Sequence, residues 1–423
     1  MRLPCPRHIR PMLGAALTAL IALIALTTLT PTPARADLAY ADALRLALDQ
    51  APMVQAQQAA LASAQAAQPA AAALPDPRLS LGLENLPISG ADRGNFSRDF
   101  MTMQRIALSQ ELPNRAKRAA RADGAAAKVE RERANLVAVQ LAQQREAALA
   151  WLAVYFAEQR GTHLARLEHE NRLLTDTLPP RIAAGRAMPA ELSLARQEAL
   201  ALADRRDDAA RDVARARSAL RRWVGERSDE PLAGQPDVPA PQPAHLHAHL
   251  AQNAEIAPLV AQQALARAEA AEADADQRGD WGWTLAYSKR SPAYSDMLSF
   301  QVSIDLPWQR GQRQQPLLAA KRYDIARLDA ERDALLRQHQ AELDTWLADL
   351  AALDAQWARA QGPGTALADQ RVTLALAGYE AGRGDLGAVL AARRERAEAA
   401  QRLLDLDAQR LALRVRLNTL IAE

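Results

Sequence analysis

The chain contains one sequence unit twice, and this internal repeat limits its possible folds more than any other feature. Residues 51–54 (Ala-Pro-Met-Val) match residues 257–260 (Ala-Pro-Leu-Val), and Gln- and Ala-rich helical sequence follows each match. An Ala-Gly-Arg turn occurs late in each copy, at residues 184–186 and 381–383. We therefore expect the chain to fold as two copies of one structural unit.

The repeat also predicts where the chain divides. We expect a first unit at residues 37–228 and a second at residues 245–423, joined by a Pro-rich connection at residues 229–244. Within each unit the predicted order is a helix, a pair of strands, a long helix and a returning helix.

The N-terminus has the three parts of a secretory signal. Arginines precede an apolar stretch at residues 15–26, and Ala-Arg-Ala at residues 34–36 fits a cleavage site. We therefore predict that residues 1–36 are removed on export. A retained membrane anchor is the alternative, because residues 12–29 could nearly span a bilayer.

Composition excludes several classes of protein. Charged residues make up 24% of the chain but nearly balance, at a formal net charge of +2, which argues against a nucleic-acid-binding face. The only cysteine, Cys5, lies in the predicted signal, so we expect no disulfide and no cysteine-linked lipid anchor in the mature chain. No apolar run of helical span length follows the signal, so any membrane crossing would need β-strands.

Two segments of the second unit, within residues 281–306, alternate in the way that membrane strands do. One side of each is aromatic or aliphatic and the other is small or polar, over about ten residues, which suffices for a tilted strand to cross a bilayer. The apolar side would face lipid and the polar side a water-filled lumen. A soluble hairpin packed on helices is the alternative. The predicted lumen-facing positions are Ser299, Gln301, Ser303 and Asp305.

A weaker strand pair is predicted in the first unit, at about residues 78–109. Four strands cannot close a barrel, and lipid offers no hydrogen bonds to open sheet edges, so copies of the chain would have to share one barrel. Two copies would leave little lumen, whereas four strands from each of three copies would give a twelve-stranded channel. The strands therefore predict an exported oligomeric barrel in contact with outer-membrane lipid.

Long helices make up most of the rest, so the predicted fold class is mainly α with a β-barrel contribution. Residues 114–177 hold no proline and would span roughly 95 Å at ~1.5 Å per residue. The matching helix of the second unit begins near Gln315 and is expected to break at Gly-Pro-Gly, residues 362–364. These antiparallel helices would form a tunnel beyond the membrane.

The segments around the two glycine turns, residues 181–196 and 379–393, resemble the TolC family of outer-membrane efflux proteins. The resemblance implies a trimer with a twelve-stranded barrel and a periplasmic α-tunnel. It also implies two partners, a periplasmic membrane-fusion adaptor that docks on the turns and an inner-membrane pump, of the RND type. The implied docking residues are Gly185, Arg186, Gly382, Arg383 and Asp385.

Residues 75–87 and 98–113 resemble the heavy-metal branch of that family, the CusC/CzcC type, which implies export of heavy-metal cations. Export of drugs or secreted polypeptides is the alternative cargo, and a structural periplasmic coiled-coil protein is the alternative from another class. In the best-known relatives acidic residues follow the second turn glycine and close the pore. Ala388 and Ala391 stand at those positions here, which puts the chemistry of the gate in doubt.

Other candidate sites are weaker. His245, His247 and His249 could include a metal-binding pair, but exposed polar residues are common where a helix begins. Arg393, Arg394 and Arg396 are either a docking or gating network or the solvated face of a coiled coil. We find no catalytic motif and expect neither enzymatic activity nor a cofactor.

Overall fold

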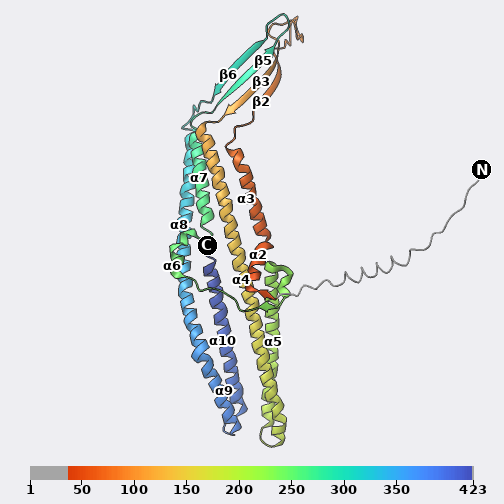
Figure 1. The fold of residues 1–423 in the computed structure, drawn as a ribbon, viewed down its shortest axis with the longest axis vertical. Coiled ribbons are helices and arrows are strands. Elements are labelled where there is room, and N and C mark those ends of the chain that lie inside the picture. The colour runs from red at the N-terminus through yellow and green to blue at the C-terminus, as the bar shows by residue number, and fades with distance from the viewer. Residues whose placement is uncertain (1–36, 422–423) are drawn as a thin grey trace, which may run out of the picture.

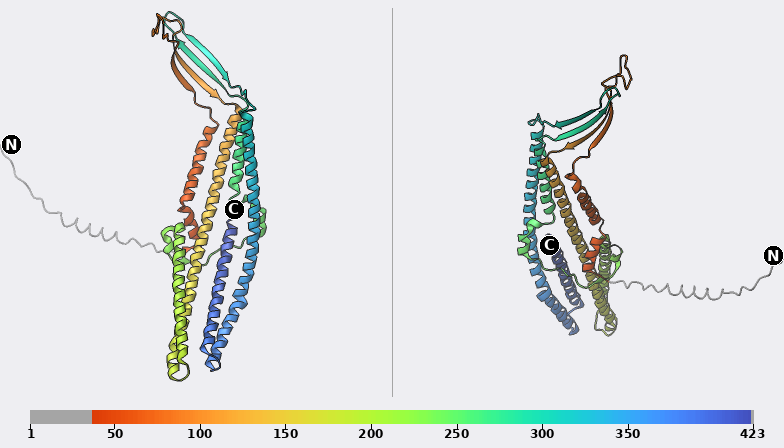
Figure 2. Two further views of the ribbon diagram at one scale, coloured as in Figure 1. Left: turned by 180° about the vertical axis from the view of Figure 1, so that it is seen from behind. Right: turned by 45° about the horizontal axis from the view of Figure 1, so that its top comes forward.

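The computed structural model describes residues 37–421. The predicted signal peptide at residues 1–36, with Cys5, lies outside the described residues. The molecule is long and narrow, with a small β-sheet at one end and two helical hairpins that turn at the other (Figure 1). In both views of Figure 2 the sheet and the two helical turns lie at opposite ends.

The first half of the chain begins at the middle of the molecule. Strand β1 (Leu38–Ala39) and helix α2 (Tyr40–Asp49) precede α3 (Pro52–Ala71), which runs up to the sheet. Strands β2 (Arg78–Glu84) and β3 (Met103–Leu112) then lead into α4 (Arg115–Ala183). Helix α5 (Pro189–Val224) returns along α4 as far as the 3-10 turn η1 (Gly225–Asp229).

The second half follows the same order. The connection includes β4 (Leu232–Ala233), α6 (Pro243–Ala248) and the 3-10 turn η2 (Leu250–Gln252). Helix α7 (Ala257–Ala275) precedes strands β5 (Trp281–Lys289) and β6 (Met297–Ile304). Helix α8 (Gln314–Arg359), the π-helical turn η3 (Ala360–Gly364) and α9 (Thr365–Glu380) run to the second turn, and α10 (Leu386–Asn418) returns. The prediction of a mainly helical chain is confirmed.

The predicted interruption at Gly-Pro-Gly is present, in the form of a π-helical turn rather than an open break. Helix α8 ends at Arg359, residues 360–364 form the π-helical turn, and α9 begins at Thr365. A π-turn widens the helix by one residue and so accommodates a proline that lacks an N–H. The hydroxyl of Thr365 donates to the carbonyl of Gln361 at 2.7 Å and to that of Gly362 at 3.2 Å. The side chain thereby binds carbonyls that the irregular turn leaves available.

Helix α4 is longer than expected because it continues through Pro179 and Pro180 to Ala183. Its 69 residues correspond to about 100 Å at ~1.5 Å per residue. The end of the helix is held by packing, since Leu178 is fully buried and Ile182 lies against the same apolar cluster. Packing of this kind outweighs the local cost of proline.

The four longer strands form one antiparallel sheet in the order β2-β3-β5-β6. Strands β3 and β5 are neighbours although the whole α4–α5 hairpin separates them in sequence. Within the described chain, β2 and β6 each pair on one side only, so each leaves one edge open. No helix of residues 37–421 is long and apolar enough to cross a membrane.

A buried cluster around Trp151 holds the middle of the molecule together. Trp151 has no exposed surface, and its indole N–H donates to the carbonyl of Leu38 at 3.2 Å. The Leu38 N–H donates in turn to the carbonyl of Pro231 at 2.8 Å, which joins β1 to the connection beside β4. This core therefore ties α4, the start of the described chain and the inter-unit connection to one another.

Replacing Trp151 by alanine should lower the free energy of unfolding by about 3–5 kcal/mol, because a large buried ring and its hydrogen bond are lost together. Trp308→Ala is the matched control, since Trp308 is 88% exposed in the chain. Thermal unfolding of the purified chain measures both effects. Equal melting temperatures for the two variants would contradict the assignment of this core.

Candidate functional site

The two turns at the helical end have the same geometry. Gly185 ends the α4 side with φ +68°, and Gly382 ends the α9 side with φ +71°. The N–H that follows each glycine reaches back five residues: Arg186 donates to the carbonyl of Arg181 at 2.8 Å, and Arg383 donates to that of Gly378 at 2.9 Å. These bonds satisfy helix-end carbonyls, and a left-handed backbone of this kind favours glycine.

The glycines are required for their backbone angles rather than for space. Among the described residues, no atom lies within 4 Å of a Cβ built on Gly185 or Gly382. Asp385 has a local structural role as well, because its carboxylate accepts from the N–H of Ala388 at 2.7 Å and caps α10. All five residues of the predicted docking set are exposed at this end of the molecule.

A hydrogen bond joins the two hairpins close to their turns. The hydroxyl of Tyr379, on α9, donates to the carboxylate of Glu191, on α5, at 2.6 Å. The guanidinium of Arg181, on α4, lies 4.6 Å from the centre of the same ring. Burial, with the hydrogen bond to Glu191, raises the pKa of Tyr379 above its usual range. Three helices therefore meet on one tyrosine, a contact that the sequence analysis missed.

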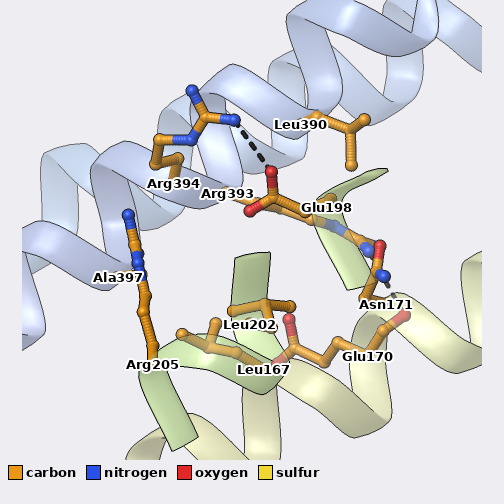
Figure 3. Close-up of a pocket in the computed structure, with 10 residues that line it drawn as sticks. All are labelled: Leu167, Glu170, Asn171, Glu198, Leu202, Arg205, Leu390, Arg393, Arg394 and Ala397. Atoms are coloured by element: carbon orange, nitrogen blue, oxygen red, sulfur yellow. Dashed lines mark hydrogen bonds and ion pairs between the residues drawn. The ribbon is translucent and has the colours of Figure 1, made fainter. Parts of the chain in front are cut away.

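The arginines of α10 form a second set of links, two to three helical turns above the first (Figure 3). Arg394 pairs with Glu198 of α5 at 2.8 Å, and Arg396 pairs with Glu170 of α4. Glu395 faces the other way and pairs with Arg371 of α9. These ion pairs join different helices. They do not run along one helix, as the alternative of a solvated coiled-coil face predicted.

Arg393 lies at the centre of this second set. Burial lowers the pKa of its guanidinium. The guanidinium donates a hydrogen bond to the backbone carbonyl of Glu170 at 3.4 Å. Asn171 is buried beside it and donates to the carbonyl of Ala195 at 3.1 Å. The cavity that these side chains enclose measures about 30 Å³, roughly the volume of one water molecule. The cluster therefore joins α4, α5 and α10 through side-chain contacts.

The three histidines do not converge. The rings of His245 and His249 stack with centroids 4.3 Å apart, and Nδ1 of His249 lies 3.0 Å from the carbonyl of His245. His247 faces α8 instead, where its Nε2 is 3.8 Å from Asp344 and its Nδ1 is 3.3 Å from Gln340. Within residues 37–421, no group of three or more His, Cys, Asp or Glu side chains is arranged to hold a metal ion.

At the other end of the molecule, the register of the sheet separates two faces. Ser299 lies opposite Ala286, Gln301 opposite Thr284, and Ser303 opposite Gly282, so the small and polar residues share one face. Asp305 lies one residue beyond β6, and its N–H donates to the carbonyl of Asp280 at 2.8 Å. The predicted lumen-facing positions thus follow one side of the sheet, with Asp305 at its helical end.

The opposite face is apolar and uncovered in the single chain. Phe300 is 68% exposed and Leu298 is 73% exposed, although both lie within a strand. In contrast, Ala286 of the polar face is 1% exposed. Large side chains therefore project from one face while small ones crowd the other, which lets the sheet curl toward the small side.

No family model matches the chain, and no curated protein matches it in sequence. Solved structures do match. One match is a crystal structure of CusC, which is described in terms of the conformational changes that accompany folding and transmembrane channel formation. Its sequence is 17% identical to this chain and its TM-score is 0.76. The match covers 91% of this chain and 92% of the CusC chain.

Two further structures match over similar lengths. A membrane protein from Pseudomonas aeruginosa has 17% identity and a TM-score of 0.74, with 90% of each chain covered. The outer-membrane protein VceC from Vibrio cholerae has 17% identity and a TM-score of 0.73, over 90% of this chain and 95% of that one. Other matching structures, at 13% to 16% identity, are described as outer-membrane channels.

The chain has the fold of outer-membrane channel proteins. This likeness covers nearly all of residues 37–421 and supports the TolC-like chain fold that the turn motifs resemble. At such low identity it shows the fold alone, and it does not single out the heavy-metal branch. The structures that share the fold are channel proteins rather than enzymes.

Tyr379→Phe should loosen the turns, because it leaves the half-buried carboxylate of Glu191 without its donor at a cost of about 1–2 kcal/mol. Amide hydrogen exchange in residues 181–192 and 376–388 should become faster, while exchange around Trp151 stays unchanged. Tyr323→Phe is the control, since Tyr323 is 77% exposed. Identical exchange in the two variants would show that the tyrosine link does not hold the hairpins together.

Proposed function

We propose that the chain is the outer-membrane subunit of a tripartite efflux pump, in which a homotrimer forms a passive exit duct. One observation supports this most strongly: an apolar-faced sheet with two open edges stands at one end of a rod of long helices. A soluble protein would cover such a face, and would cap or shield such edges. In a membrane, lipid would cover the apolar face, and neighbouring copies of the chain would pair with the open edges.

The number of copies follows from closure. Strand β2 of one copy would pair with β6 of the next, so that all backbone groups of the sheet are bonded within the membrane. Three copies would give twelve strands, enough for an aqueous lumen, with Ser299, Gln301 and Ser303 lining it. The small side chains of that face suit the concave side of the barrel.

The helical rods would extend about 100 Å into the periplasm and end in the turns at Gly185 and Gly382. Each copy offers two similar exposed turns, so a trimer would present six at the end that faces the inner membrane. We assign docking of a periplasmic membrane-fusion adaptor to Gly185, Arg186, Gly382, Arg383 and Asp385. An inner-membrane pump, of the RND type, would supply the energy.

We propose heavy-metal cations as the cargo, on the strength of the resemblance of residues 75–87 and 98–113 to the heavy-metal branch. A passive duct has no need of a resident metal site, because a tight site in the lumen would slow release. The location would be the outer membrane of a Gram-negative bacterium, with no cysteine-linked anchor.

A charge on the lipid-facing side of β6 should harm insertion more than a charge on the lumen side. Val302→Asp should lower the yield of membrane-embedded trimer, because a charged side chain on the lipid face of a barrel strand is destabilising. The neighbouring Ser303→Asp should lower it little. Heat-modifiable trimer on a gel measures the yield. Equal yields would contradict the assigned faces.

A side chain at the second turn should block docking while leaving the trimer in the membrane. Gly382→Val forces a β-branched residue into a left-handed conformation and distorts the turn. Gly378→Ala, in the helix just before, is the matched control, since a Cβ at that position meets no described atom within 4 Å. Crosslinking to the adaptor should fail only in Gly382→Val. Normal crosslinking in that variant would refute the docking assignment.

The cargo can be identified by deleting the gene and measuring the sensitivity of the strain to metal ions, dyes and detergents. Loss of the gene should raise sensitivity to Cu, Zn, Co or Cd and leave tolerance to dyes and detergents unchanged. The reverse pattern would replace the metal assignment with organic export. Recovery of the protein in the soluble periplasm would reject the duct in favour of a structural coiled-coil protein.

A further inference from the structure

We propose that one phosphate-bearing lipid binds the apolar face of the sheet near its loop end, with an acyl chain in a depression between β2, β3 and β5 and its phosphate at Lys289. The inference rests on the proposed function, because it takes this face to contact lipid. It adds a specific lipid site and a headgroup charge, neither of which follows from an apolar face alone.

The depression lies between three neighbouring strands and has a volume of about 550 Å³. Its apolar lining comes from the same face of each strand, as the register shows: Leu81 lies opposite Ile106, and Ile106 opposite Tyr287. Leu83 extends it toward the loops. Leu79, Leu285 and Phe300 continue the same exposed face toward the helices, so an extended chain could follow it.

Lys289 lies at the loop end of this depression. It is the last residue of β5, it pairs in register with Gln104, and alternation places it on the same face as Leu285 and Tyr287. Its side chain is exposed and makes no ion pair within the described residues. An unpaired ammonium at the border of an apolar face suits an anionic headgroup.

One cation of the polar face is paired within the chain. Arg105 is paired there with Glu84 at 2.7 Å, across neighbouring strands. Lys289 on the lipid side makes no such ion pair: the carboxylate that interacts with it electrostatically, Asp296, is hydrogen-bonded to Tyr287 and to the N–H of Arg290. An anion from the lipid side would give Lys289 a direct partner.

The loops beside Lys289 hold a second exposed cation, Arg98, along with charged side chains that are otherwise engaged. Asp296 is already engaged, since its carboxylate accepts from the hydroxyl of Tyr287 and from the N–H of Arg290. Arg290 is engaged too, because its Nε donates to the carbonyl of Ser295 at 2.8 Å and its guanidinium lies over Tyr294. Arg98, in the β2–β3 loop, is exposed and forms no ion pair among the described residues.

Aromatic side chains mark the same level of the molecule. Phe100 and Tyr294, from the two loops, lie with ring centroids 6.5 Å apart, and they are 57% and 41% exposed. Aromatic residues with cations at one end of an apolar strand face are typical of a membrane–water interface. A lipid phosphate would lie at this level while its chain occupies the depression.

Native mass spectrometry of the purified full-length chain in detergent tests the proposal. The probes are dioleoyl phosphatidylglycerol and dioleoyl phosphatidylcholine, which share acyl chains and differ in headgroup charge. The wild-type chain should bind the anionic lipid more tightly. Lys289→Gln and Arg98→Gln should each weaken that binding about five-fold and leave the zwitterionic lipid unaffected.

Two further variants separate the headgroup from the chain. Leu81→Trp fills the depression and should weaken both lipids. Arg78→Gln is the matched control, because Arg78 is an exposed cation of the opposite face and should change neither affinity. Equal affinity of the wild type for the two lipids, or unchanged binding in Lys289→Gln, would overturn the proposal. So would displacement of the lipid by millimolar inorganic phosphate, which would indicate a site for the free anion.

Failure of this proposal can be told apart from failure of the duct. Membrane extraction and trimer yield are measured on the same preparations, and all four variants should retain the wild-type yield. A membrane-embedded trimer without preference for the anionic lipid would reject only the lipid site. A wild-type chain that needs no detergent for extraction would reject the duct itself.

Discussion

Hydrogen bonding at the two open edges of the sheet is the constraint on which the rest of the structure depends. Strands β2 and β6 each leave one row of backbone groups without a partner in the described chain. In lipid each unsatisfied group costs several kcal/mol, so a sheet of this size is stable there only when other copies complete it. The proposed trimer, its lumen and the arrangement of its helices all follow from that requirement.

The sheet is also fixed to the helices beneath it. Asn114 caps α4, and its backbone N–H and side-chain amide both donate to Asp280, just before β5, at 2.8 and 3.0 Å. Lys117 reaches the same carboxylate at 3.1 Å. These contacts join the first strand pair's helix to the second strand pair, so the orientation of the sheet determines that of the rods. At the far end, Tyr379 and the arginines of α10 hold the two hairpins together.

The positions of the strands and of the two helical turns could be predicted from the sequence, because they depend on local patterns. Alternation of apolar and polar residues located β5 and β6, and a glycine between helical runs located both turns, because only local geometry is involved. Contacts between distant segments could not be read in the same way. The pairing of β3 with β5 and the bond from Tyr379 to Glu191 join residues more than 150 positions apart, and no local pattern marks them. The interruption at residues 360–364 was located from Gly-Pro-Gly, but its form was not, because a π-turn can accommodate a proline while the helical path continues.

Disulfide trapping between copies tests the account most directly. Leu81 of β2 and Leu298 of β6 lie on the same row of the sheet within one chain, one on each open edge. The only native cysteine, Cys5, lies in the predicted signal, so engineered cysteines are expected to be the only ones in the mature chain. Because closing a barrel staggers its strands, the β6 residue that meets Leu81 of the next copy lies off this row, so Leu81→Cys is combined in turn with a cysteine at each position of β6. After oxidation in membranes, at least one of these double variants should give covalent species of one, two and three chains and none larger. Monomers alone in every variant, or a series that continues beyond three, would contradict a closed barrel of three copies.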